Sequence, residues 1–267
     1  MRSLFAAAAA LAAALGLAGA ASAEEEAPKP PHQEWSFEGP LGTYDEAALQ
    51  RGFQVYKEVC SACHAVKHLY YRDLTEIGYS EDQVKGFAAQ AQVSDGPNDQ
   101  GEMYQRPGRP SDPFPAPFAN DQAARAANNG SLPPDLSLIV KARDGGPDYV
   151  YAILTGFKES PKDFKMNPGM NYNEYFPGHQ IGMPPPLTSD GQLTYADGTK
   201  ATVAQMAHDV VSFLAWASEP NLNERHRMGA KVILFLIVGA AIFYAAKRKI
   251  WADLHGHPSD EPGIGDD

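Results

Sequence analysis

Two cysteines and a histidine near residue 60 have the types and spacing that attach haem covalently. The run Cys60-Ser-Ala-Cys63-His64 follows the C-x-x-C-H pattern of c-type haem attachment. Residues three apart lie on one face of a helical turn, so both thiols can add to the two vinyl groups of one porphyrin. His64 then lies beside the ring, where its imidazole can bind the iron. The pattern predicts one covalently bound haem c, held by Cys60, Cys63 and His64.

Other uses of a cysteine pair fit this sequence less well. A redox-active dithiol needs no histidine after the second cysteine and belongs in a βαβ unit. A structural zinc site takes four ligands, usually from two such pairs. Cys60 and Cys63 are the only cysteines in the 267 residues. A disulfide framework is therefore excluded, and stability must come from the core and the haem.

The second axial ligand of the iron decides what such a haem can do. An iron with an open site binds gases or reacts, whereas a second protein ligand suits it for electron transfer, and methionine raises its potential. Met183 is favoured because Gly182 lets the backbone approach a porphyrin, and the prolines at 184–186 stiffen the loop. His179 is the main rival. The other methionines considered are Met103, Met166, Met170, Met206 and Met228.

A helix directly before the motif must carry it to the haem. The capping box Thr43-x-x-Glu46 predicts where this helix starts. Leu49, Phe53 and Tyr56 follow at helical spacing and form an apolar stripe that leads to the two cysteines. We therefore expect one face of this helix to be core and haem wall at once.

The remaining elements are predicted from caps and periodicity. Helices are expected at about residues 80–91, 120–127, 133–145, 147–155 and 202–217. Residues 94–118 contain six prolines and three glycines, so they are expected to be irregular. Residues 157–200 lack helical periodicity, and Asp197-Gly198 predicts a tight hairpin turn. The fold class is therefore all-α, with helices and long irregular loops around a porphyrin.

Both ends of the chain carry apolar runs. Arg2, the apolar stretch after it and Ala21-Ser-Ala23 predict a cleaved secretory signal peptide. Near the other end, the 19 residues from Met228 to Ala246 contain one charge, Lys231, which can reach the interface. That length reaches the lower range for a membrane-spanning helix.

These two runs predict the domain organisation. Basic residues flank both ends of the second run, so the orientation follows from the signal peptide rather than from the positive-inside rule. The expected parts are a signal peptide (1–23), a periplasmic haem domain (24–226), a transmembrane anchor (227–247) and a cytoplasmic tail (248–267).

The chain is acidic. Its formal net charge is −11, and residues 24–224 carry 15 Lys and Arg against 28 Asp and Glu. This charge argues against nucleic acid as a partner and permits a cationic protein partner. Seven acids and one lysine lie between Asp73 and Glu102. The stretch is either an ordinary solvated surface or a docking face that steers a basic protein partner.

Three stretches resemble the cytochrome c1 family. They are residues 125–137 (RAANNGSLPPDLS), 141–150 (KARDGGPDYV) and 175–184 (YFPGHQIGMP). The likeness extends over nearly the whole mature chain, including the single C-terminal anchor. It implies a cytochrome c-like haem domain in which Met183 is the axial ligand opposite His64. It also implies that Arg143 pairs with a haem propionate and that Tyr149 lies nearby.

The resemblance further implies a function and partners. Members of the family are the haem subunit of ubiquinol–cytochrome c oxidoreductase in respiratory or photosynthetic chains. A bacterial member would accept an electron from the Rieske iron–sulfur protein and pass it to a soluble cationic cytochrome c. It would stand beside cytochrome b in a dimeric complex of the inner membrane, with the haem domain in the periplasm. No catalytic residue that makes or breaks bonds is expected in this chain.

Two other functions stay open from the residues alone. The chain could be a five-coordinate haem protein that binds or senses a gas. It could also be the haem subunit of a different membrane oxidoreductase.

Some bacterial members of the resembled family have an extra disulfide in the haem domain, for which this chain has no cysteines.

Overall fold

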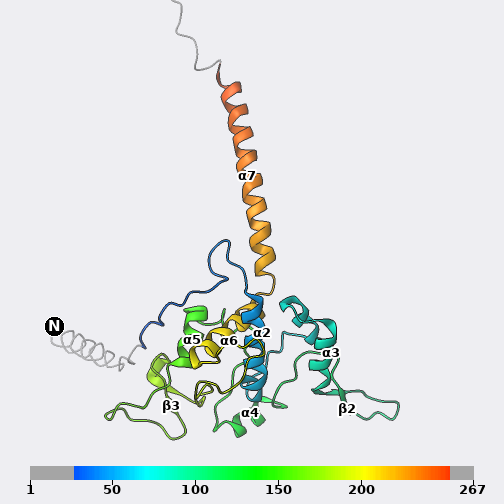
Figure 1. Cartoon of the computed structure of the whole chain (residues 1–267), viewed down its shortest axis with the longest axis vertical. Helices are drawn as coiled ribbons and strands as arrows, with labels where there is room; N and C mark the ends of the chain where they lie inside the picture. The colour runs from blue at the N-terminus through cyan, green and yellow to red at the C-terminus, as the bar shows by residue number, and fades with distance from the viewer. Residues whose placement is uncertain (1–26, 253–267) are drawn as a thin grey trace, which may run out of the picture. The chain divides into compact units, whose positions relative to one another are not determined.

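The computed structural model describes residues 27–252, and helices dominate this part of the chain. The α-helices are α2 (Glu46–Glu58), α3 (Glu81–Ala89), α4 (Asp121–Ala127), α5 (Gly146–Thr155), α6 (Val203–Ser218) and α7 (Leu222–Ile250) (Figure 1). Short 3₁₀ helices lie at Cys60–Ala62, Tyr71–Ile77 and Pro177–His179. Strands β1 (Gln92–Asp95) and β2 (Tyr104–Pro107) form one antiparallel pair, and β3 (Asn171–Tyr172) and β4 (Gln180–Ile181) form another. The all-α class is confirmed, with these two small ribbons added.

The chain divides into two compact units. Within the described residues, the first comprises 27–33 and Glu46–Ser218, and the second comprises Glu34–Asp45 and 219–252. Helix α7 belongs to the second unit, and all the other elements named above belong to the first. The predicted signal peptide, residues 1–23, lies outside the described residues, as does most of the predicted tail.

The first unit is built on the crossing of α2 and α6 (Figure 1). Gly52 of α2 lies directly against α6, and a Cβ at this position would come within 2.7 Å of the Phe213 Cβ. Only glycine permits so close an approach of two helices. Phe53 and Tyr56 then pack on Phe213, with ring centroids 5.7 and 5.8 Å apart. This crossing fixes the direction in which α2 delivers the cysteine motif.

Several predicted helices are confirmed together with their caps. Ser80 and Gln83 form the capping box of α3. The Asn120 side chain accepts a hydrogen bond from the Ala123 amide at the start of α4, at 2.9 Å. Pro147 stands in the first turn of α5, where its missing N–H costs nothing. The Thr202 hydroxyl accepts from the Gln205 amide at the start of α6, at 3.1 Å.

The predicted helix over residues 133–145 is wrong. The structure has turns there, although Leu136, Ile139 and Val140 are buried as expected. The Leu136 amide donates to the carbonyl of Ala65 at 2.8 Å, which ties the start of this segment to the residues just after the cysteine motif. The start of the segment bonds to this distant part of the chain, and the amides of Ile139, Lys141 and Ala142 donate to carbonyls three or four residues back, in turns.

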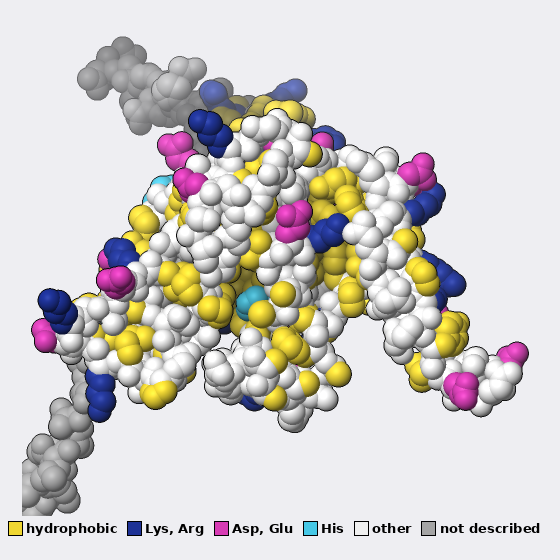
Figure 2. Space-filling view, turned by 60° about the horizontal axis from the view of Figure 1, so that its bottom comes forward, with side chains coloured by type: hydrophobic (Ala, Val, Ile, Leu, Met, Phe, Trp, Pro, Cys, Tyr) yellow, Lys and Arg dark blue, Asp and Glu magenta, His cyan; other side chains and the backbone are white. Residues whose placement is uncertain are grey.

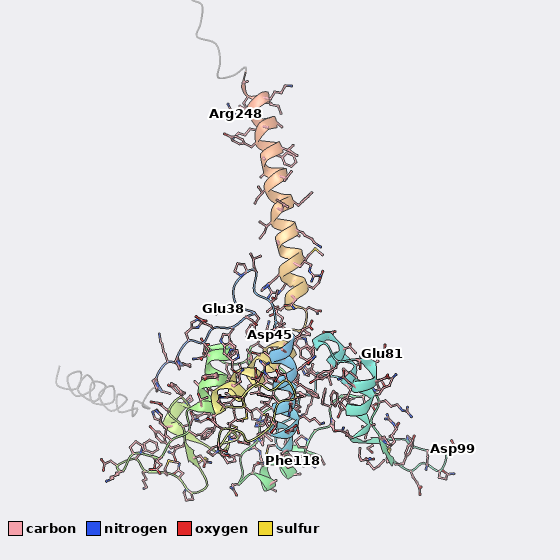
Figure 3. The ribbon with its side chains drawn as sticks, in the orientation of Figure 1. Glu38, Asp45, Glu81, Asp99, Phe118 and Arg248 are labelled. Carbon is pink, nitrogen blue, oxygen red and sulfur yellow. The ribbon has the colours of Figure 1, made fainter. Side chains whose placement is uncertain are left out.

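Three smaller expectations are also corrected. Helix α2 begins at Glu46, two residues later than a cap at Thr43 predicts, and the Thr43 amide donates to the Ser36 carbonyl at 2.9 Å. Residues 94–118, expected to be irregular, contain β2 and the end of β1, and Asp99 lies in the loop at the tip of this hairpin (Figure 3). The turn at Asp197-Gly198 exists, with Gly198 at φ +78°, but no paired strands flank it in the described chain.

The second unit contains the long apolar helix. Helix α7 has 29 residues and contains the whole predicted membrane span, and its most apolar window has a mean hydropathy of 2.1 with none of it buried. Its length and composition suffice to cross a membrane. Segment 34–45 belongs to the same unit and is bonded to residues at or just before the start of α7. The Tyr44 hydroxyl donates to the Glu219 carbonyl at 3.2 Å, and His226 Nδ1 donates to the Gly42 carbonyl at 2.7 Å.

Candidate haem-binding site

The two cysteines stand just beyond the end of α2. The helix ends at Glu58, and the chain tightens into a 3₁₀ turn in which the Cys63 and His64 amides both donate to the Cys60 carbonyl, at 3.1 and 2.9 Å. Both cysteines are free and half-buried. Burial raises the pKa of Cys60 to about 12, with the neighbouring Cys63 adding to the effect. A reactive dithiol needs a lowered pKa, so this environment disfavours redox exchange.

The His64 side chain is oriented so that one ring nitrogen is left for a metal. Its Nδ1 lies 2.8 Å from the carbonyl oxygen of Pro134. A carbonyl only accepts, so Nδ1 carries the proton and Nε2 carries the lone pair. Burial is the main reason that the pKa of His64 is lowered, which favours the neutral ring. A backbone carbonyl that orients a ligating imidazole in this way is a recurring feature of metal sites.

Residues 131–137, called here the bridging segment, hold this acceptor in place. Beyond Pro134, the Asp135 carboxylate accepts from the Lys67 amide at 3.1 Å. The Ser137 hydroxyl accepts from the His68 amide, also at 3.1 Å. Together with the bond from Leu136 to Ala65, these contacts fasten the bridging segment to the residues that directly follow the motif.

Met183 lies just beyond β4 and is half-buried. The pairing of β3 with β4 brings Asn171 opposite Ile181, and the Asn171 side chain donates to the Met183 carbonyl at 3.3 Å. Gly182 lies against Ser131, the first residue of the bridging segment. The same segment therefore contacts both His64 and the residue next to Met183.

The other candidate ligands occupy different surroundings. His179, the main rival, is buried with its Nδ1 3.2 Å from the Asn173 carbonyl and its ring stacked on Tyr172. Met206 is fully buried in α6. Met103 is 63% exposed on the β1–β2 hairpin and Met170 is 38% exposed. Met166 is half-buried, and Met228 is exposed on α7.

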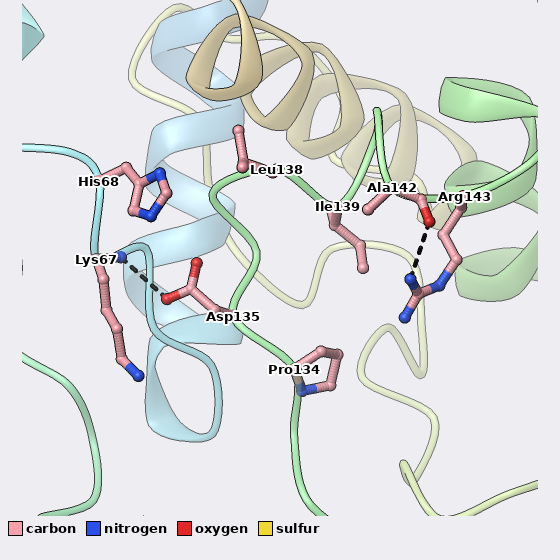
Figure 4. A pocket seen from close by; sticks show the side chains of 8 residues that line it. All are labelled: Lys67, His68, Pro134, Asp135, Leu138, Ile139, Ala142 and Arg143. Atoms are coloured by element: carbon pink, nitrogen blue, oxygen red, sulfur yellow. Dashed lines mark hydrogen bonds between the residues drawn. The ribbon is translucent and has the colours of Figure 1, made fainter.

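Arg143 lies at one end of a cavity of about 280 Å³, with Lys67 and His68 at the other end (Figure 4). Pro134 and Asp135 of the bridging segment line the cavity between them. The exposed Arg143 guanidinium donates to its neighbour's carbonyl at 3.0 Å, which leaves further N–H groups for a ligand. Tyr149 does not line this cavity, but Arg143 is close enough to lower its pKa, against a larger rise caused by burial.

These residues fit a c-type haem. Figure 2 shows a face hollowed near its middle, with hydrophobic side chains around the hollow and one histidine visible in it. Two free thiols can attach such a cofactor, an imidazole with an open Nε2 and a thioether can bind its iron, and a guanidinium can pair with its carboxylates. Sequence reasoning did not identify the Pro134 carbonyl or the contact between Ser131 and Gly182. The Pro-Pro-Asp run was a signal for the first, but it was interpreted as a helix start.

Comparison with known proteins decides the family. Residues 35–254 match the family model described as the Cytochrome C1 family. The chain belongs to the cytochrome c1 family. It is 48% identical over 256 residues to cytochrome c1 of Rhodospirillum rubrum, which covers 90% of this chain and 94% of that protein. It is 50% identical over 226 residues to "Cytochrome c1 1, heme protein, mitochondrial" of Arabidopsis thaliana, covering 84% of this chain and 73% of that one.

One relative is much longer than this chain. The protein named cytochrome b/c1 from Bradyrhizobium diazoefficiens is 51% identical over 257 residues, covering 88% of this chain but only 37% of that protein. Membership of the cytochrome c1 family makes haem the cofactor of this chain. It confirms the family resemblance of the three stretches within residues 125–184.

Proposed function

We propose that this cytochrome c1 family protein is the haem subunit of a bacterial ubiquinol–cytochrome c reductase. It accepts an electron from the Rieske iron–sulfur protein and passes it to a soluble cytochrome c. It works beside cytochrome b in a dimeric complex, anchored in the inner membrane by α7 with its haem domain in the periplasm and its C-terminus in the cytoplasm. The long relative named cytochrome b/c1 supports cytochrome b as a partner.

The observation that carries this proposal is the hydrogen bond from His64 Nδ1 to the Pro134 carbonyl, beside two free thiols. In this arrangement Cys60 and Cys63 would hold one haem c by thioether bonds. His64 would bind the iron through Nε2, and Met183 would supply the second axial ligand. When bound, the haem supplies a one-electron couple, and a methionine opposite histidine raises its potential.

The protein's own groups would hold the axial ligand and the haem in place during electron transfer. The bridging segment holds the His64 ring in one orientation, so the ligand need not reorganise. Arg143 would grip a haem propionate through parallel N–H bonds, with Tyr149 beside it. No residue of this chain is proposed to make or break a bond of the substrate, because quinol oxidation belongs to the partner subunits.

Replacing Met183 tests the ligand set. In the purified haem-loaded protein, Met183→Leu should abolish the long-wavelength absorption band that sulfur gives to ferric haem and should lower the midpoint potential. Haem content per chain should stay the same, because the cysteines are unchanged. An unaltered spectrum and potential would mean that Met183 is not the ligand. A wild-type protein that already lacks the band and binds carbon monoxide readily would favour a gas-binding function.

Co-purification tests the assignment to a complex. Solubilised from its native membrane, the chain should purify together with cytochrome b and an iron–sulfur protein, and the complex should reduce a cationic cytochrome c with quinol. Purification with the subunits of another oxidoreductase would contradict the proposed function and show that the chain is a haem subunit of that enzyme.

A further inference from the structure

We infer that Ser131 and Gly182 are positioning residues that set where the Met183 sulfur stands relative to His64. The inference rests on the proposed function, because it takes Met183 as the second axial ligand. It adds a mechanical link: the two ligand positions, 119 residues apart in the sequence, are held to each other through the bridging segment.

One end of the link is the attachment to His64. The Pro134 carbonyl accepts from the His64 ring at 2.8 Å, and Leu136 and Ser137 bond to the chain just after it. Pro133 and Pro134 have fixed φ angles, so the chain between Ser131 and these bonds is stiff. Any displacement of Ser131 therefore works against a segment that has several fixed points.

The other end is the contact with Gly182. A Cβ built on Gly182 would lie 2.8 Å from the Ser131 Cβ and closer still to its Oγ. Real side chains do not approach this closely, so residue 182 must lack a Cβ for the two segments to meet. The φ of Gly182 is not in the left-handed region, so glycine is needed here for space and not for backbone conformation.

Met183 follows this contact directly and is held from its other side. The Asn171 side chain donates to its carbonyl at 3.3 Å, and β3 pairs with β4 just before Gly182. The Met170 sulfur lies 3.9 Å from the position that a Gly182 Cβ would take. With these contacts on both sides, a side chain added at 182 must push the Met183 loop away from the bridging segment.

The experiment uses imidazole as a competitor for the iron in the purified haem-loaded complex. Gly182→Ala should loosen Met183 and strengthen imidazole binding by about tenfold or more, since overpacking of one methyl typically costs enough to shift an equilibrium by that factor. The sulfur absorption band should weaken and the midpoint potential should fall. Haem content per chain separates this effect from failure to fold.

A second substitution exchanges the sizes of the two residues in contact, so that the small residue stands at 131 and the larger one at 182. Ser131→Gly removes both side-chain atoms that the methyl added by Gly182→Ala would meet, so Ser131→Gly/Gly182→Ala should bind imidazole nearly as weakly as the wild type. Ser131→Gly alone should strengthen imidazole binding less than Gly182→Ala does, because it removes one side of the contact without forcing the two segments apart. The matched control is Gly86→Ala in α3, where an added Cβ meets no atom within 4 Å; it should leave the affinity unchanged.

The outcomes separate the inference from the proposed function. If Met183→Leu leaves imidazole binding and the spectrum unchanged, the proposed ligand is wrong. If Met183→Leu has its effect but Gly182→Ala binds imidazole no tighter than the wild type, only the positioning inference is overturned. The inference is also overturned if Ser131→Gly fails to reverse the effect of Gly182→Ala.

Discussion

Arg51 and Asp209 form an ion pair between α2 and α6, and removing the arginine alone should destabilise the first unit strongly. The Arg51 guanidinium donates from two nitrogens to the two oxygens of Asp209, at 2.9 and 3.0 Å. The Asp209 side chain is 0% exposed and that of Arg51 is 15% exposed. A second carboxylate, Asp197, accepts from the same guanidinium at 2.9 Å.

The size of the effect follows from what Arg51→Met leaves behind. Breaking a buried pair by removing one partner costs about 3–5 kcal/mol, because the other charge stays buried and uncompensated. Gln205 still donates to Asp209 at 3.0 Å, so we expect the lower end, about 3 kcal/mol. Adding Asp209→Asn removes the stranded charge, and the double variant should be at least about 1 kcal/mol more stable than Arg51→Met.

Unfolding of the full-length haem-loaded protein by guanidinium chloride, in detergent and followed by circular dichroism, measures these differences in the free energy of unfolding. Lys85→Met is the matched control, since the pair of Lys85 with Asp82 is exposed on both sides; its effect should be below about 1 kcal/mol. The reasoning fails if Arg51→Met costs no more than this control, or if the double variant is no more stable than Arg51→Met.

Three further predictions concern helix packing, acid stability and partner docking. Gly52→Ala should destabilise the protein by about 1–2 kcal/mol, because overpacking against α6 outweighs the gain in helix propensity, whereas Gly86→Ala in α3 should be neutral or stabilising in the same thermal melts. Arg106 lowers the pKa of Asp112 to about 2; the resulting stability is complete above the unfolded pKa of about 4 and is lost as pH falls towards 2. Urea unfolding across that pH range should show this loss in the wild type and a flatter profile in Arg106→Gln. Electron transfer to a cationic cytochrome c should slow steeply as salt rises, because salt screens exposed acids such as Asp99; a rate indifferent to ionic strength would exclude electrostatic docking.

Local signals were sufficient for much of this architecture. The C-x-x-C-H run identifies the attachment turn because its chemistry depends on residues only three or four apart. Ser80, Asn120 and Thr202 marked three helix starts, since a cap is satisfied within its own first turn. The stripe of Leu49, Phe53 and Tyr56 is buried as expected.

Errors arose where the partner of a backbone group lies far along the chain. Residues 133–145 have the caps and apolar spacing of a helix, but the Leu136 amide bonds to Ala65 and the Asp135 carboxylate to the Lys67 amide. The β1–β2 hairpin was missed because its four-residue strands show only a shallow alternation of burial, among prolines that disfavour sheet. The contact of Gly182 with Ser131 is likewise invisible without the fold.

The acceptor that orients His64 is a main-chain oxygen, so it does not depend on which amino acid occupies position 134. Every amino acid has this carbonyl, so a point mutation at residue 134 changes the stiffness of the chain but cannot delete the acceptor. Genetic variation can tune the orientation of the imidazole only by moving the peptide, through neighbours such as Asp135 and Ser137. The tautomer of the ring is thus buffered against substitution at the residue that determines it.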